Sequence, residues 1–315
     1  MGRLSKHDLY LVDFSMSSLA QHALTLGIGI IYLTTLLGNL TIIFLVCFVQ
    51  KLHTPMYFFL CNLAIIDVTS ISNIVPKLLF ITITQDHRIG FSCCMMQLFF
   101  FVLCADAEIF MLTSMAYDRY VAVCKPLHYY TIMRKNVYIV MAASCWILGA
   151  LNSLLHTLLT SVLQFCNSSD INNFFCDLNL LLDLSTTDTK KLKIFVFLEI
   201  CFIILAQLTL TISIIIFSVI LNIRSSSGRM KAFSSCTSHL ITVILFYGPS
   251  IILYTKTESE DSKEQDMLLS MLYLFVVPMM NPLVYSLRNK DIWKAIDVLI
   301  NKTILGGCCQ VVMDH

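Results

Sequence analysis

The sequence predicts an all-α membrane protein: a bundle of seven transmembrane helices with its N-terminus outside the cell and its C-terminus in the cytoplasm. Of its 315 residues, 57% are hydrophobic and only 13% are charged, whereas a soluble domain carries roughly 25% charged residues. Seven apolar stretches are each long enough to supply the roughly 20 residues that cross a bilayer. The 21 basic and 20 acidic residues nearly balance, so the composition gives no sign of nucleic-acid binding.

The seven stretches divide the chain into three parts. Residues 1–23 form an extracellular N-terminus, residues 24–287 form the bundle, and residues 288–315 form a cytoplasmic tail. The first stretch begins after some twenty polar-leaning residues and lacks a small-residue cleavage site, unlike a secretory signal peptide. All seven are continuously apolar, which excludes the alternating pattern of a β-barrel. The spans cover about 24–49, 57–80, 95–121, 137–161, 194–221, 235–254 and 267–287.

Basic residues predict the orientation, because Lys and Arg are enriched in cytoplasmic segments of membrane proteins. An odd number of spans puts the two ends of the chain on opposite sides. Twelve of the 21 basic residues follow spans one, three and five or lie in the tail: Lys51, Arg119, Lys125, Arg134, Lys135, Arg224, Arg229, Lys231, Arg288, Lys290, Lys294 and Lys302. These segments are therefore assigned to the cytoplasm.

Four acidic residues fall inside the second, third and fifth spans: Asp67, Asp106, Glu108 and Glu199. An ionised carboxylate at the centre of a bilayer costs at least ~2.5–3.5 kcal/mol, so each is expected to face the bundle interior or water. The alternative is a neutral, hydrogen-bonded carboxylic acid that ties helices together. In the fourth span, His156 is interpreted as a structural histidine rather than a metal ligand.

Two further motifs mark the third and seventh spans. Asp118-Arg119-Tyr120 ends the third span at its cytoplasmic edge, and Asn281-Pro282 interrupts the seventh. Proline removes a backbone hydrogen bond and kinks a helix, and a neighbouring Asn can bond to the carbonyl that is released. Together with the buried acids, these motifs indicate a helix bundle that switches between two packings.

Five sequence motifs then identify the family that the chain resembles. They are GN at 38–39, LHTPMY at 52–57, MAYDRYVAVC at 115–124, KAFSSCTSHL at 231–240 and the stretch from Pro278 to Asn289. These motifs and their order along the chain resemble those of the olfactory receptors, a branch of the rhodopsin-like G-protein-coupled receptors. Among these receptors, the motifs most resemble the tetrapod (class II) branch. The resemblance implies a plasma-membrane receptor that binds a small, mostly apolar volatile and activates a stimulatory heterotrimeric G protein, which raises cyclic AMP.

The resemblance also assigns roles to individual residues. Asp67, Glu108 and Asn281 match an interior polar cluster that holds sodium in related receptors, and no other cofactor is implied. Arg119 matches the residue that meets the G protein. The switch residues are Asp118, Arg119, Tyr120, Asn281, Pro282 and Tyr285. The family usually has Ser-Tyr where Ile212-Ser213 stands here, and this departure puts the efficiency of switching in doubt.

By the same resemblance, the ligand binds in the outer half of the bundle. The matching positions are Phe101, Val102, Ala105, Asp106, Phe197, Leu198, Cys201, Tyr247, Ser250, Ile251, Tyr254, Met271 and Leu274. Asp106 and Glu108 point about 200° apart on a helix, so they cannot face one partner. Asp106 is therefore expected either to contact the ligand and tune its chemical class, or to hydrogen-bond to the fourth or fifth span.

The resemblance further implies one disulfide, between Cys94 and Cys176. A second family bridge is missing, because Thr186 stands where the partner of Cys166 is expected. Three states stay open: a free Cys166, a bond from Cys166 to the extra cysteine Cys93, or exchange among these cysteines. Asn167-Ser168-Ser169 is the one glycosylation sequon expected on the outside.

The tail is expected to form a short amphipathic helix on the membrane surface. Trp293, Ile296 and Ile300 recur at helical spacing, with basic residues on the other faces. The neighbouring Cys308 and Cys309 are either palmitoylated or part of an unmodified, disordered end.

Other classes of membrane protein require features that this sequence lacks. A retinal-binding opsin needs a lysine in the seventh span, but none lies between Lys263 and Lys290. An amine receptor would place Asp where Phe101 stands. A transporter would show repeats or broken helices, and no motif arranges the acids or His156 as the active site of a membrane hydrolase. The sequence therefore predicts a receptor and not an enzyme.

Overall fold

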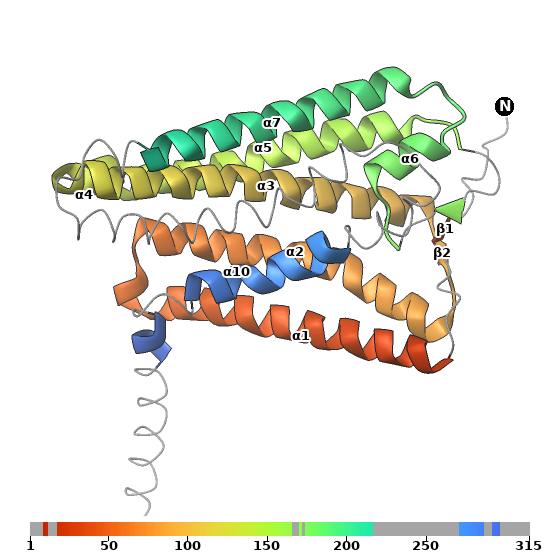
Figure 1. Ribbon diagram of the computed structural model, residues 1–315, viewed down its shortest axis with the longest axis horizontal. Helices are drawn as coiled ribbons and strands as arrows, with labels where there is room; N and C mark the ends of the chain where they lie inside the picture. The colour runs from red at the N-terminus through yellow and green to blue at the C-terminus, as the bar shows by residue number, and fades with distance from the viewer. Residues whose placement is uncertain are drawn as a thin grey trace, which may run out of the picture.

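The computed structural model describes residues 9–11, 18–165, 170–171, 174–216, 271–286 and 292–296. Over these residues, long helices lie side by side (Figure 1). Four of them are long and apolar enough to cross a membrane: α1 (Ser18–Phe48), α2 (Pro55–Thr84), α3 (Phe91–Cys124) and α5 (Lys135–Ser161). They are joined by α7 (Lys190–Ile216) and by a π-helical turn, η4 (Leu272–Val276), that continues into α10 (Val277–Ser286).

Most helices are longer than the apolar stretches that predicted them. α1 begins at Ser18 rather than near residue 24, and α3 runs from Phe91 to Cys124 rather than from about 95 to 121. Inside a membrane, a helix satisfies all of its own backbone hydrogen bonds, and nothing forces it to stop where the side chains become polar. The apolar runs therefore mark the membrane-spanning part of each helix rather than its ends.

α3 lies at the centre of the bundle. It packs against α2, α5 and α7, while α10 packs against α1 and α2. The buried apolar side chains of the described residues form three clusters. Two of these clusters fill the end of the bundle that carries the Cys94–Cys176 disulfide, and the third fills the opposite end. These two ends are called the disulfide end and the opposite end below.

The disulfide end also contains a small β-sheet, which the sequence does not predict. β1 (Leu9–Leu11) is the central strand of a three-stranded sheet. It pairs antiparallel with β2 (Arg88–Ile89) and parallel with β3 (Asp170–Ile171). Leu9 and Leu11 are each only 3% exposed and pack beside the disulfide. The N-terminal segment thus joins the connections that follow α2 and α5.

Short helices occupy the connections. At the opposite end lie the 3-10 helices η1 (Gln50–Leu52) and η2 (Pro126–His128) and the single turn α4 (Tyr129–Ile132). At the disulfide end, α6 (Leu178–Leu184) lies in the connection between α5 and α7. It forms because Leu178, Leu181 and Leu182 bury one apolar face and Asp177 caps its first turn.

The described part of the tail, residues 292–296, is helical. Ile292 and Ala295 are buried against the apolar cluster of the opposite end, whereas Trp293 is 48% exposed. The stripe of Trp293, Ile296 and Ile300 stays a prediction for the side that faces the membrane, because burial within the protein does not report contact with lipid. Ile300, Cys308 and Cys309 lie outside the described residues.

Candidate functional site

A buried polar cluster joins three helices in the middle of the bundle. Asn281 of α10 donates from Nδ2 to both carboxylate oxygens of Asp67 in α2, at 3.0 and 3.2 Å, and to Oε1 of Glu108 in α3, at 3.2 Å. These three side chains are only 1–6% exposed. The structure therefore brings together, from distant parts of the sequence, the residues to which the family resemblance assigns one cluster.

Next to this cluster, α1 and α10 are held at close range. Asn39 donates from Nδ2 to the backbone carbonyl of Pro278 at 3.1 Å, which uses a carbonyl near the proline break of α10. Gly38 permits the approach, because a Cβ at that position would lie 3.2 Å from Cγ of Pro282. The Gly38-Asn39 motif alone gives no sign of this contact, because Pro278 and Pro282 lie far away in the sequence.

A second polar site lies at the opposite end, where α3 finishes. Asp118 is 1% exposed, and the hydroxyl of Tyr129 in α4 donates to its Oδ1 at 2.7 Å. Burial and the nearby Asp118 raise the pKa of Tyr129, so its phenol keeps the proton that it donates. Arg119 contacts the sulfur of Met56 in α2, and Tyr120 packs against the apolar cluster. Tyr129 was not predicted, because a tyrosine in a short connection carries no signal of its own.

The carboxylate of Asp106 turns towards α5. Asn152 donates from Nδ2 to Oδ2 of Asp106 at 3.0 Å, and the backbone carbonyl of Asn152 lies 3.0 Å from Nδ1 of His156. His156 in turn places its Nε2 3.1 Å from Oε2 of Glu199 in α7. α5 is the fourth span. Asp106 was expected either to contact the ligand or to hydrogen-bond to the fourth or fifth span, and the structure contains a hydrogen bond to the fourth. His156 connects α5 to α7.

Three of the expected ligand positions belong to one apolar cluster at the disulfide end. Phe101 of α3, Met271 and Leu274 pack there with the loop residues Phe174 and Phe175. Val102 packs in the neighbouring cluster, and Ala105 and Cys201 are partly buried. The expected positions of the sixth span, Tyr247, Ser250, Ile251 and Tyr254, lie outside the described residues, as does the side chain of Tyr285.

Among the described residues, Leu198 is more exposed than these ligand positions. It is 59% exposed, beside Phe202 at 73%, and Phe197 is also 40% exposed. The rotation of α7 explains the difference. Val196 is buried at 2% exposure and Glu199 pairs with α5, and this turns the side chain of Leu198 outwards.

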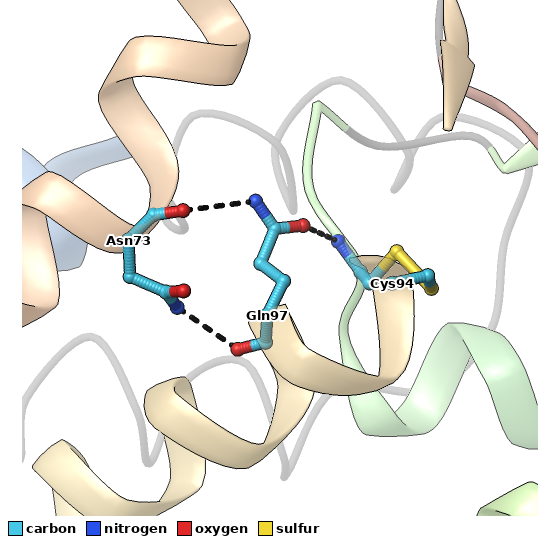
Figure 2. Close-up of a disulfide and its surroundings, with 4 residues drawn as sticks. Asn73, Cys94 and Gln97 are labelled. Carbon is cyan, nitrogen blue, oxygen red and sulfur yellow. Dashed lines mark hydrogen bonds between the residues drawn. A yellow bond between two sulfur atoms is a disulfide. The ribbon is translucent and has the colours of Figure 1, made fainter. Parts of the chain in front are cut away.

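The disulfide joins Cys94 at the start of α3 to Cys176, with Cα atoms 5.5 Å apart. The side chain of Gln97 lies between α2 and the chain next to this bond (Figure 2). Cys93 is exposed and carries a free thiol, so the structure does not join it to Cys166. Cys166 and the sequon at Asn167 lie outside the described residues.

Comparison with known proteins identifies the family. The family model for olfactory receptors matches residues 28–302. The chain is 43% identical over 295 residues to olfactory receptor 1G1 of Gorilla gorilla gorilla, and the aligned residues cover 93% of this chain and 94% of that protein. It is 44% identical over 276 residues to olfactory receptor 5AR1 of Mus musculus, covering 87% and 89%. It is 40% identical over 309 residues to olfactory receptor 8H3 of Homo sapiens, covering 94% and 96%.

Matches of this extent confirm the family that the sequence motifs indicated. The chain belongs to the olfactory receptor family, whose members are odorant-sensing, G-protein-coupled membrane receptors and not enzymes.

Proposed function

We propose that this receptor crosses the plasma membrane seven times, binds a small, mostly apolar volatile at the disulfide end and activates a stimulatory G protein that raises cyclic AMP. The observation that carries the proposal is the order of side chains along α3. Phe101 and Ala105 stand near the disulfide end, Glu108 reaches the central polar cluster, and Asp118 and Arg119 lie at the opposite end. A single helix thus connects the three places at which ligand, switch and G protein would act.

The orientation follows from the chemistry of the two ends. Disulfides persist on the oxidising, extracellular side of a membrane, which favours an extracellular disulfide end. Lys51, Lys125 and Arg134 lie in or beside the connections of the opposite end, as expected of cytoplasmic segments. This arrangement puts the N-terminal strand outside and the tail in the cytoplasm.

The ligand is expected to be small and largely apolar because the side chains at the proposed site are apolar. Phe101, Met271 and Leu274 have no hydrogen-bonding groups, and they cluster with further aromatic residues. A ligand in such surroundings gains affinity mainly by leaving water. Phe197 and Leu198 stay predicted ligand positions on a more exposed part of α7.

The opposite end offers a surface for the G protein. Leu127 is 94% exposed and Tyr130 is 83% exposed, on η2 and α4 beside the Asp118–Tyr129 hydrogen bond. Exposed side chains of this kind, next to the Asp118–Arg119 switch, suit a partner that binds there and contacts Arg119 when the helices change their packing. A ligand that binds one packing of the helices more tightly would shift the population towards it.

The central cluster also fits a sodium ion. Asp67 and Glu108 present hard carboxylate oxygens from two helices at one buried position, beside the amide of Asn281 that donates to both. Hard cations prefer carboxylate and carbonyl oxygens. We propose that these residues hold sodium, which would supply positive charge between the two carboxylates. The purified wild-type receptor should then be more stable in NaCl than in KCl, and the Asp67→Asn variant should be equally stable in both salts. A difference between the two salts that persists in this variant contradicts the assignment.

The decisive experiment measures cyclic AMP in cells that express the receptor and are exposed to a panel of volatiles. Arg119→Ala is expected to abolish the response at equal surface expression. Arg134→Ala removes an exposed arginine from the same end and should leave the response intact. A receptor that reaches the surface but raises no cyclic AMP with any volatile, or an Arg119→Ala variant that still responds, would contradict the proposal.

A further inference from the structure

Two adjacent loop residues cover the proposed ligand positions. Phe174 and Phe175 are only 1% and 2% exposed although they belong to the connection between α5 and α7. The ring of Phe175 lies edge-on to Phe101 with centroids 5.2 Å apart, and the ring of Phe174 stacks with Phe275 of η4 at 6.3 Å. The two rings lie 5.1 Å from each other. They therefore bridge α3 and the last described span, and they are called the aromatic roof below.

The buried side chain of Gln97 holds the chain that carries this roof (Figure 2). Its Oε1 accepts a hydrogen bond from the backbone N–H of Cys176 at 2.9 Å, and its Nε2 donates to the carbonyl of Asn73 in α2 at 3.3 Å. Asn73 returns a bond from Nδ2 to the carbonyl of Gln97 at 2.9 Å. Gln97 is 4% exposed, so water does not compete for these bonds.

The N–H that donates to Gln97 belongs to the peptide unit that joins Phe175 to Cys176. The disulfide to Cys94 fixes the side chain of Cys176, but the backbone can still rotate about the single bonds on either side of its rigid peptide units. The hydrogen bond to Gln97 fixes the peptide unit itself. Two attachments to α3, at Cys94 and at Gln97, therefore determine where the ring of Phe175 lies against Phe101.

We infer that Gln97 is a positioning residue for odorant recognition: it holds the aromatic roof of Phe174 and Phe175 over the ligand site and so limits the size of the volatile that the receptor accepts. This inference rests on the proposed ligand site. It adds Phe174 and Phe175 to the residues that contact the ligand, and it assigns to Gln97 a role in selectivity without contact with the ligand. Releasing the roof should admit larger apolar molecules more than small ones.

The test uses a thiol placed under the roof and needs no known odorant. In the full-length receptor, Ala105→Cys is labelled with methyl, propyl and benzyl methanethiosulfonate, and the unsubstituted receptor corrects for labelling of its own cysteines. Gln97→Met keeps the volume of the side chain but loses both hydrogen bonds. This variant should raise the labelling rate of the benzyl reagent about five- to tenfold, because the loss of one or two hydrogen bonds raises the open fraction of the loop by about that factor. The rate of the methyl reagent should rise less.

Three companion variants make the result specific. Gln21→Leu removes a glutamine that donates at 2.7 Å to the carbonyl of Thr82, between α1 and α2, and should leave all rates unchanged. Gln97→Glu keeps an acceptor for the N–H of Cys176 and should restore most of the size discrimination. Phe175→Ala shortens the roof itself and should raise the benzyl rate even if Gln97→Met fails to reach the cell surface.

The outcomes separate the inference from the proposed site. The inference is wrong, while the site stands, if the engineered thiol reacts but Gln97→Met leaves the benzyl-to-methyl ratio unchanged at equal surface expression, or if Phe175→Ala leaves it unchanged. If the thiol stays unreactive in every background, including Phe175→Ala, the proposed site is wrong and the inference fails with it. A ratio that rises only when Gln97 or Phe175 is changed supports the inference.

Discussion

Asn281 satisfies two buried carboxyl groups with a single amide. Replacing it with Ala leaves Asp67 and Glu108 without this donor, so we expect the free energy of unfolding to fall by about 1–3 kcal/mol. Asn62→Ala is the matched control, because Asn62 accepts from the indole of Trp146 and donates to the carbonyl of Phe58, both neutral groups. Thermal unfolding of the purified receptor should show the larger loss for Asn281→Ala. Equal losses would mean that the central cluster contributes no more than an ordinary interhelical hydrogen bond.

The hydrogen bond between Asp106 and Asn152 predicts how Asp106 affects recognition. Because its carboxylate bonds to α5, Asp106→Asn should leave the rank order of responses to amines, alcohols and esters unchanged. Ala105→Leu adds bulk on the side of α3 that carries Phe101, one turn away, and should change that order. Dose–response curves for the three odorant classes compare the two variants. A changed order in Asp106→Asn would return Asp106 to the ligand site.

Asp177 makes the disulfide end sensitive to pH. Burial raises its pKa from the usual 3.8 to about 6, although the backbone N–H groups of Leu178, Asn179 and Leu180 oppose this shift. Because the folded pKa is the higher one, the folded loop binds more protons between these values, and its stability is greatest below about pH 4 and falls as the pH rises through 6. Asp177→Asn keeps an acceptor for the cap but does not titrate.

The rate at which a phosphine reduces the Cys94–Cys176 bond reports on opening of this loop. For the wild-type receptor it should rise between pH 4 and pH 7 by up to about a hundredfold, the limit set by two pKa units. For Asp177→Asn it should stay nearly constant over that range. A similar rise in both proteins would show that another group controls the loop.

Among the elements, α3 and α5 lie close together at Gly149, where α5 lacks a side chain. A Cβ at Gly149 would lie 3.1 Å from the carbonyl oxygen of Leu103 and 3.2 Å from the backbone N of Ala107. Gly149→Ala must therefore push the helices apart, at a cost of about 1–3 kcal/mol in stability. Gly27→Ala in α1 is the control, because a Cβ there meets nothing within 4 Å, and it should be neutral or stabilising by up to about 1 kcal/mol. Melting temperatures that fall equally would exclude close packing at Gly149.

Elements differ in how well the sequence predicts them, and the reasons are physical. The helices were predictable from their apolar stretches. Acids such as Asp67 and Glu108 stand out in these stretches and have few acceptable environments, so an interior position was predictable as well, and the family resemblance grouped them with Asn281. The rotation of α7 had a single signal, Glu199, because most of the other side chains in this helix are apolar. The pairing of Glu199 with His156 sets the rotation that leaves Leu198 59% exposed.

Contacts between short connections were also beyond the sequence. β1 has three residues and β2 two, too few for an alternating pattern to be recognised. The aromatic roof had one usable signal: two adjacent phenylalanines directly before Cys176 in the connection between α5 and α7. Gln97 had none, because a single glutamine at a helix end is ordinary and its partners, Asn73 and Cys176, come from distant parts of the chain.

At the scale of the whole molecule, the sheet and the disulfide fasten the same outer connections. β1 pairs with β2, which precedes α3, and with β3, which lies shortly before Cys176. Tyr10 is the residue of β1 that pairs with both neighbours, so Tyr10→Pro removes a backbone donor at the centre of the sheet and should cost about 2–3 kcal/mol. Replacing Cys94 and Cys176 with Ser opens a link across 82 residues and should cost up to about 4.5 kcal/mol.

If β3 stays beside β1 only because the disulfide holds that connection in place, these two losses will not add. Without the disulfide, β3 is already released, and Tyr10→Pro has less pairing left to remove. We therefore expect the triple variant to be more stable than the sum of the separate losses allows, by about 1 kcal/mol or more, the size of coupling seen between groups that share a partner. Unfolding of the four proteins in detergent, compared as a double-mutant cycle, measures this coupling. Strict additivity would mean that the sheet and the disulfide stabilise the disulfide end independently, and that the N-terminal strand is held by its own buried leucines rather than by the position of β3.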